Sequence, residues 1–251
     1  GLVGSEMCIR DRIKAIDRSE KERRNALKEK SRKILQLGLL GTVGILVALK
    51  YTAFTVETTM QVVRHFGGSG NFSVGRILVP IGISFYTFQA MSYVIDVYRN
   101  DTSVQKNPVY FGTYVALFPQ LIAGPIVRYR DIAPQLKERT HSLEAAASGA
   151  SRFAVGLGKK VLVANVLAQL VSAYKASAEQ TALYAWLYTI AFTLQIYFDF
   201  SGYSDMAIGL GRIFGFRYLE NFDYPYISAS ITEFWRRWHM SLGSWFRDYV
   251  Y

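Results

Sequence analysis

Residues 223–251 read DYPYISASITEFWRRWHMSLGSWFRDYVY, and the interpretation of the whole chain begins from this stretch. Ser230 and Glu233 have the spacing of a capping box, which predicts a helix that begins near Ile231. From there aromatic and apolar residues recur at steps of three and four, the spacing of one helical face: Trp235, Trp238, His239, Leu242, Trp245, Phe246 and Tyr249. His239 therefore lies on the predicted aromatic face, where an imidazole is either a structural core residue or a functional one.

The distribution of apolar residues predicts a membrane protein. The chain has 251 residues, of which 51% are hydrophobic, and long apolar runs alternate with short basic segments. The predicted spans are 34–54, 77–98 and 182–200. Residues 109–127 are long enough to cross a bilayer, but Pro119, Gly124 and Pro125 argue against a straight helix, so a kinked or re-entrant element and a full span are equal alternatives. The expected fold is all-α, a multi-span integral membrane helix bundle with tilted or re-entrant helices. A soluble α/β enzyme would need Gly-rich turns after short strands, and the sequence has none that are convincing.

Charge and the cysteine and histidine content argue against two classes of function, nucleic-acid binding and metal binding. The net charge is +10, and residues 10–33 alone hold eleven Lys and Arg against five Asp and Glu. Such a cluster before an apolar span is typical of a cytoplasmic loop, and no nucleic-acid-binding motif accompanies it, so no nucleic-acid partner is expected. Cys8 is the only cysteine, and the three histidines lack the spacing of a metal site, so we predict no metal.

The segments between the spans define the remaining expectations. Residues 1–12, GLVGSEMCIRDR, have the appearance of a translated sequencing adapter, 13–33 form the basic cytoplasmic loop, and 34–251 form a partial membrane domain. We expect an extracytoplasmic loop at 55–75, an interfacial amphipathic segment at 128–160, and short apolar helices at 161–174 and 203–218. The glycines at 209, 211 and 215 favour close helix packing. Asp199 and Asp205, separated by a Ser-Gly break, are expected to pair with an arginine or to cap a helix.

Four strings together carry a resemblance to a known family: PIGISFYTFQAMSYVIDVYR (80–99), FPQLIAGPIVRYRDIAPQL (118–136), QIYFDFSGYSDMAIGLGRIFGF (195–216) and ENFDYPYISASITEFWRRWHMSLGSWFRDYVY (220–251). They resemble the membrane-bound O-acyltransferase (MBOAT) family, within it the bacterial branch that contains the alginate O-acetyltransferase membrane subunit. The resemblance covers residues 13–251 and implies many helices around a central chamber. One family histidine matches His239. Another lies beyond Tyr251, so the chain is expected to be a fragment, without N-terminal spans and a C-terminal part, and inactive alone.

The resemblance also implies the reaction, which is acyl transfer. An acyl group passes from an activated cytoplasmic donor, acetyl-CoA or another acyl thioester, to an exported polysaccharide or a partner protein, with no tightly bound cofactor. His239 is the predicted catalytic residue. Arg236 and Arg237 either contact a phosphate-bearing donor or anchor the helix at the headgroups, and Trp235, Trp238 and Asp199 are further candidates for donor or substrate binding. The implied location is the bacterial inner membrane, multi-pass, with periplasmic acetyltransferase partners.

Three alternatives remain. The D-alanyl transfer subunit of teichoic acid modification is similar around WHMSL and WFRDY but differs at SITEFWRRWH. A transporter is suggested by the broken spans at Pro80 and Pro119 and by the carboxylates among apolar residues. A non-catalytic scaffold of a polysaccharide-export complex is the third alternative.

Overall fold

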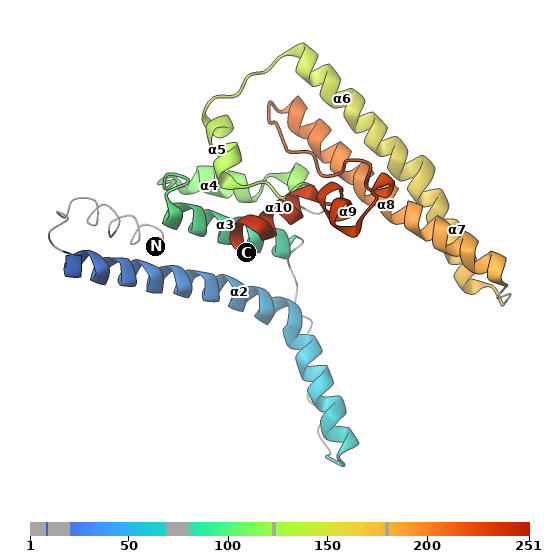
Figure 1. The fold of residues 1–251 in the computed structure, drawn as a ribbon, viewed down its shortest axis with the longest axis horizontal. Coiled ribbons are helices and arrows are strands. Elements are labelled where there is room, and N and C mark those ends of the chain that lie inside the picture. Colours follow the sequence, from blue (N-terminus) through green and yellow to red (C-terminus); the bar gives the residue numbers. More distant parts are fainter. Residues whose placement is uncertain (1–8, 10–20, 69–79, 81, 122–123, 179–180) are drawn as a thin grey trace. The chain divides into compact units, whose positions relative to one another are not determined.

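The computed structural model describes residues 9, 21–68, 80, 82–121, 124–178 and 181–251 (Figure 1). The regular structure of these residues is helical, apart from one isolated antiparallel bridge between Phe222 and Trp238. The all-α prediction is thus confirmed for the described part of the chain. Segment 1–12, apart from residue 9, and residues 13–20 of the expected cytoplasmic loop lie outside it. The chain packs as two compact units, one reaching to Ala116 and including Arg128–Arg130, the other formed by Leu117–Val127 and Asp131–Tyr251.

The first unit begins with α2, Lys21–His65, which is longer than the sequence predicted. The predicted span 34–54 lies inside it, but the expected loop at 55–75 is wrong in its first part, because the helix continues to His65. Neither glycine nor proline interrupts residues 55–65, and the hydroxyls of Thr55 and Thr59 donate hydrogen bonds to carbonyls one turn earlier. The helix ends where Gly67 takes a left-handed conformation, with φ +82°.

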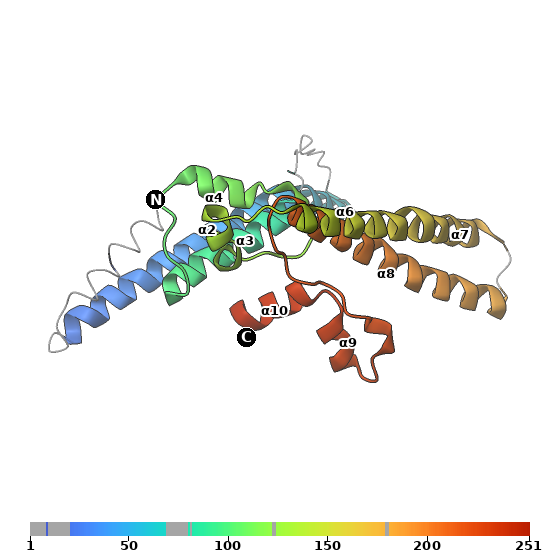
Figure 2. The same cartoon turned by 90° about the horizontal axis from the view of Figure 1, so that it is seen from above.

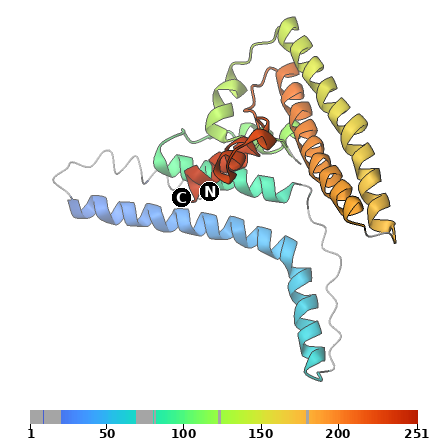
Figure 3. The ribbon, with the colours of Figure 1, turned by 45° about the vertical axis from the view of Figure 1, so that its right-hand side comes forward.

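Helix α3, Ile83–Arg99, packs beside α2 (Figure 3). It ends where predicted, because Asn100 adopts a left-handed conformation and its N–H caps the last turn. Helix α4, Pro108–Val115, follows, with Asn107 as its N-cap. An aromatic cluster joins these elements to the start of α5, Tyr129–Lys137: Tyr93, Phe111, Tyr114 and Tyr129. The predicted interruption of 109–127 is confirmed, because α4 stops at Val115 and only the short 3-10 turn η1, Phe118–Gln120, follows.

The second unit is built on a pair of long helices. Helix α6, Leu143–Gly158, continues through a π-helical turn, η2, Lys159–Ala164, into α7, Asn165–Ala176. Helix α8, Ala182–Ile213, lies along this rod (Figures 1 and 2). The predicted boundary at residue 160, with a separate short helix beginning at residue 161, is therefore wrong, whereas the interfacial location stays a prediction. The π turn absorbs a local change of pitch without ending the helix.

Glycines allow the two rods to approach closely. A Cβ atom at Gly156 would lie 2.6 Å from the carbonyl oxygen of Gly202, and one at Gly149 would lie 2.6 Å from that of Gly209. The expected break at Ser201 and Gly202 is wrong, because α8 runs straight through both residues. Gly202 serves helix packing instead, as small residues do where helix backbones meet. The helix ends at Gly215, whose φ of +77° belongs to a Schellman cap.

Among the residues that the structure describes, two helical stretches are long and apolar enough to cross a bilayer, Asn25–His65 and Leu143–Ala176. The first contains the predicted span 34–54, and the second lies where an interfacial segment was expected. Helix α3 has only 17 residues in the structure, and α8 is not one of the two stretches. The multi-span bundle therefore stays a prediction.

Candidate functional site

The sequence around His239 forms two helices, α9, Ile231–Arg237, and α10, Met240–Tyr249. The predicted helix start is confirmed: the hydroxyl of the N-cap residue Ser230 accepts the Glu233 N–H, while the Glu233 carboxylate accepts the N–H of Ala229, the residue before the N-cap. The prediction of one continuous helix is wrong, because His239 adopts a left-handed conformation with φ 46° and ψ 53° and becomes the N-cap residue of α10.

A nonlocal pairing explains this break. Phe222 forms the antiparallel bridge with Trp238, the Asp223 N–H donates to the Arg237 carbonyl at 3.0 Å, and the Met240 N–H donates to the Asn221 carbonyl at 3.0 Å. Residues 221–223 thus hold the chain on both sides of His239 in a non-helical path. A left-handed conformation costs a non-glycine residue about 1–2 kcal/mol, so these contacts hold the turn against that cost.

The imidazole of His239 is half-buried and contacts Asn221 and Phe200. Its Nδ1 lies 2.9 Å from Oδ1 of Asn221, and its ring packs edge-on against Phe200 of α8, with 4.8 Å between ring centroids. Burial lowers the pKa of His239 from its ordinary value to about 4, which keeps the ring neutral at physiological pH.

The predicted aromatic face, which would have placed His239 in line with three tryptophans, is not the arrangement observed. Trp238 belongs to an aromatic cluster with Phe222 and Phe234, with ring centroids 5.0 and 5.6 Å apart. Trp245 is buried within α10, and Trp235 is 59% exposed. Once the helix breaks at His239, the helical stripe that would have aligned these side chains no longer exists.

Asn221 is the centre of a buried polar network. Its Oδ1 accepts the hydroxyl of Ser241 at 2.8 Å and the backbone N–H of Ser241 at 3.3 Å, in addition to its contact with His239. Its Nδ2 donates to the hydroxyl of Ser204 on α8 at 2.9 Å. Ser241 in turn accepts the backbone N–H of Ile126 at 3.0 Å. Asn221, Ser204 and Ser241 are each at most 2% exposed, so the network lies out of contact with bulk water.

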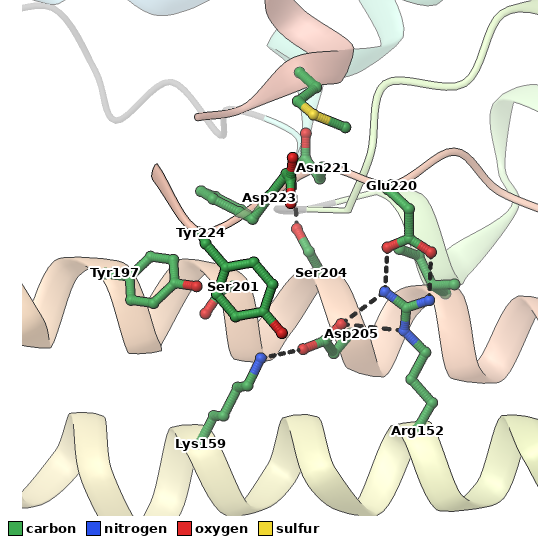
Figure 4. Close-up of a pocket in the computed structure, with 13 residues that line it drawn as sticks. Arg152, Lys159, Tyr197, Ser201, Ser204, Asp205, Glu220, Asn221, Asp223 and Tyr224 are labelled. Atoms are coloured by element: carbon green, nitrogen blue, oxygen red, sulfur yellow. Dashed lines mark hydrogen bonds and ion pairs between the residues drawn. The ribbon is translucent and has the colours of Figure 1, made fainter. Parts of the chain in front are cut away.

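A cavity of about 430 Å³ opens beside this network (Figure 4). Asn221, Ser204 and Met240 line it on one side, and the hydroxyl of Ser201 is buried at its wall with no hydrogen-bond partner among the described residues. An ion cluster lines another side, contributed by α6, η2, α8 and the segment after α8: Arg152, Lys159, Asp205 and Glu220. Of the residues that hold His239 in place, Asn221 and Met240 line the cavity, whereas His239 itself is not a lining residue.

The two carboxylates of α8 both form ion pairs, Asp205 within the ion cluster and Asp199 outside it. Asp205 accepts hydrogen bonds from Arg152 at 2.9 and 3.1 Å and from Lys159 at 2.7 Å, and Asp199 pairs with Lys160. Lys159 and Lys160 are consecutive residues of the π turn. Because a π turn holds more residues than an α turn, neighbouring side chains diverge less and both reach α8. The expected pairing with an arginine holds for Asp205, whereas Asp199 pairs with a lysine.

The two arginines of α9 have different surroundings. Arg237 donates to Glu233 at 3.0 Å and to the carboxylate of Asp223 at 3.0 Å, so its guanidinium is engaged in holding α9 to the segment before it. Arg236 is exposed and has no ion pair within the described residues. Of the two arginines of α9, Arg236 is therefore the more exposed and the one whose guanidinium is not held in an ion pair among the described residues.

Sequence reasoning missed Asn221, Ser204 and Ser241. Their signal in the sequence is faint: each is an uncharged polar residue, and no regular spacing relates the three positions. Within the part of the chain that the structure describes, no cluster of three or more His, Cys, Asp or Glu side chains could hold a metal ion.

Residues 102–251 match the model of the MBOAT, membrane-bound O-acyltransferase family. A probable alginate O-acetylase, AlgI, of Azotobacter vinelandii is 52% identical over 217 residues, which cover 86% of this chain and 43% of that protein. A peptidoglycan O-acetyltransferase of Helicobacter pylori is 32% identical, with 86% of this chain and 46% of the relative covered. A teichoic acid D-alanyltransferase of Bacillus subtilis is also 32% identical, with coverage of 68% and 44%.

The chain spans less than half the length of each of these relatives. The family match, in contrast, covers more than half of the chain and includes the helices and the polar network around His239. The chain belongs to the membrane-bound O-acyltransferase family.

Proposed function

We propose that this chain is part of a membrane O-acyltransferase that transfers an acetyl group from an acyl thioester to a hydroxyl of an exported polysaccharide or of a partner protein. Family membership and the similarity to a probable alginate O-acetylase support the acyl transfer. One observation carries the assignment of the site: His239 is a neutral, half-buried imidazole, held by a polar network beside a cavity.

Acyl transfer requires the acceptor hydroxyl to lose its proton as its oxygen attacks the thioester carbonyl. In our proposal His239 takes this proton, the new carbon–oxygen bond forms, the carbon–sulfur bond breaks, and the proton is returned to the leaving thiolate. A positioned general base of this kind contributes about 10²- to 10⁴-fold in rate. Keeping the imidazole neutral before the reaction leaves it able to accept the proton.

The donor and the partners follow from the same comparison. We propose acetyl-CoA or a related acyl thioester as the donor, approached from the cytoplasm, with Arg236 available to a phosphate group of the donor because its guanidinium is exposed and unpaired in the described structure. Arg237 is a weaker candidate, since its guanidinium already pairs with Glu233 and Asp223. We further propose a multi-pass protein of the bacterial inner membrane that works with periplasmic acetyltransferases.

A second candidate is the transfer of a D-alanyl group. The 32% identity to a teichoic acid D-alanyltransferase supports it, and the chemistry at His239 would be the same, because only the acyl group and the acceptor change. The higher identity to the alginate relative favours acetyl transfer.

The test uses the full-length protein with His239→Ala, expressed in cells that make the polymer, with O-acetyl groups released and measured by chromatography. Acetylation is expected to fall to background at unchanged protein level. His65→Ala serves as the matched control, because His65 is an exposed residue at the end of α2. Unchanged acetylation in His239→Ala would remove His239 from the mechanism.

A further inference from the structure

We propose that Asn221 is a positioning residue that fixes the tautomer of His239, with the hydrogen on Nδ1 and the lone pair on Nε2. This inference rests on the proposed function, in which His239 accepts a proton. A neutral imidazole exists as two tautomers, and only a ring nitrogen without hydrogen can accept a proton. The partner of the other nitrogen therefore decides which atom is available.

The orientation of the Asn221 amide is determined by its other neighbours. The backbone N–H of Ser241 points to the amide at 3.3 Å, and an N–H can only donate. The atom that faces it must be an acceptor, which identifies it as Oδ1 rather than Nδ2. On the opposite side, the hydroxyl of Ser204 accepts the Nδ2 hydrogen at 2.9 Å. A flipped amide would set its NH₂ group against the N–H of Ser241.

This orientation determines the state of His239. Oδ1 of Asn221 lies 2.9 Å from Nδ1 of His239, and a carbonyl oxygen only accepts. Nδ1 must then carry the hydrogen, so that Nε2 keeps its lone pair and faces away from Asn221. The contact between Nδ1 and the Ser241 hydroxyl, at 3.5 Å, is longer and does not compete, since that hydroxyl donates to Oδ1 at 2.8 Å.

Asn221 also holds the backbone of His239. Its own carbonyl accepts the N–H of Met240, the residue after the left-handed turn. One residue therefore fixes both the main-chain turn and the ring that the turn presents. Through Ser204 the amide is anchored to α8, the helix that also supplies Phe200, which packs edge-on with the ring.

Two substitutions in the full-length protein separate this role from a structural one. Asn221→Leu removes the acceptor oxygen and is expected to lower kcat by about 100-fold or more with little change in KM, because the wrong tautomer becomes accessible. Asn221→Asp keeps an acceptor oxygen and is expected to retain much more activity. Its added negative charge stabilises the imidazolium, so the acidic limb of its pH–rate profile should move to higher pH.

The decisive measurement is the pH–rate profile of acyl transfer in membrane vesicles, normalised to the amount of folded protein. An acidic limb in Asn221→Asp that coincides with that of the unsubstituted protein would overturn the proposal, even if Asn221→Leu fails to fold. Asn107→Leu, which removes the N-cap of α4, is the control for loss of a structural asparagine and should leave the profile unchanged. Full activity of Asn221→Leu, with His239→Ala inactive, would refute the positioning role alone. Activity in His239→Ala would refute the proposed function itself.

Discussion

The ionisation of His239 determines how the proposed reaction depends on pH. Burial lowers the pKa of this ring to about 4, so that it is neutral and able to accept a proton at every pH well above 4. We expect the rate of acyl transfer to be constant from neutral pH down to about pH 5 and to be halved near pH 4, whereas an unperturbed histidine would lose half its activity near pH 6.5. The measurement is kcat/KM against pH in detergent or vesicles.

The same shift affects stability, and its sign is opposite to that of a histidine in an ion pair. Between pH 6.5 and 4 the unfolded chain binds a proton at this position and the folded chain does not, so the free energy of unfolding decreases as the pH falls through this window. Thermal unfolding followed over that range separates loss of fold from loss of catalysis. A midpoint of inactivation near pH 6.5 with the protein still folded would contradict the assigned environment of His239.

At the scale of elements, the contact between α6 and α8 depends on glycine. A Cβ at Gly156 would meet backbone atoms, the Gly202 carbonyl oxygen at 2.6 Å and the Met206 nitrogen at 2.8 Å, which cannot rotate away. We expect Gly156→Ala to separate the helices and to destabilise the protein by about 1–3 kcal/mol, as overpacking does. The measurement is the thermal stability of purified full-length protein.

Gly158→Ala is the matched control two residues away on the same rod. A Cβ at Gly158 meets nothing within 4 Å, so alanine should be neutral or should stabilise the helix by up to about 1 kcal/mol. Equal changes in thermal stability in Gly156→Ala and Gly158→Ala would show that α6 and α8 do not pack closely at Gly156.

The helices differ in how much of them the sequence predicts. The N-terminal cap at Ser230 and the end of the predicted span 77–98, one residue before the end of α3 at Arg99, are local signals, and both were predicted correctly. The break at His239 was not predictable from the helical stripe, because it depends on pairing with residues 221–223, which the periodicity of α9 and α10 does not contain. Ser201 and Gly202 were misjudged for a related reason: a Ser-Gly pair signals a break only when no neighbouring helix packs against it.

The residues of the candidate site also differ in whether the sequence alone could identify them. His239 was identified from its place among aromatic residues and from the family resemblance. Its partner Asn221 lies 18 residues earlier and is recognisable only once the fold brings its amide to Nδ1 of the ring. The ion pairs of α8 were predicted in part. The carboxylates of α8 were expected to be paired, but the π turn that brings two consecutive lysines to them leaves no periodic signal in the sequence.

At the scale of the whole molecule, the orientation of the α6–α7 rod relative to the membrane can be tested directly. Residues Leu143–Ala176 form 34 residues of continuous helix, about 51 Å long at 1.5 Å per residue, whereas the hydrocarbon core is about 30 Å thick. A spanning helix of this length projects from both faces of the bilayer. An interfacial helix, as the sequence first indicated, would keep both ends on one face.

Single cysteines at the two ends distinguish these arrangements. We expect Leu143→Cys and Ala176→Cys, each exposed in the structure, to react with a membrane-impermeant maleimide from opposite sides of the membrane. The background is otherwise cysteine-free full-length protein, which includes Cys8→Ser, and labelling of intact cells is compared with labelling of inverted vesicles. The physical reason is the hydropathy of the rod, which makes burial of its central turns in lipid favourable. Labelling of both positions from the same side would show that the rod lies along the membrane surface. The helices that line the cavity, α6 and α8, would then lie at the membrane interface and not in a transmembrane bundle.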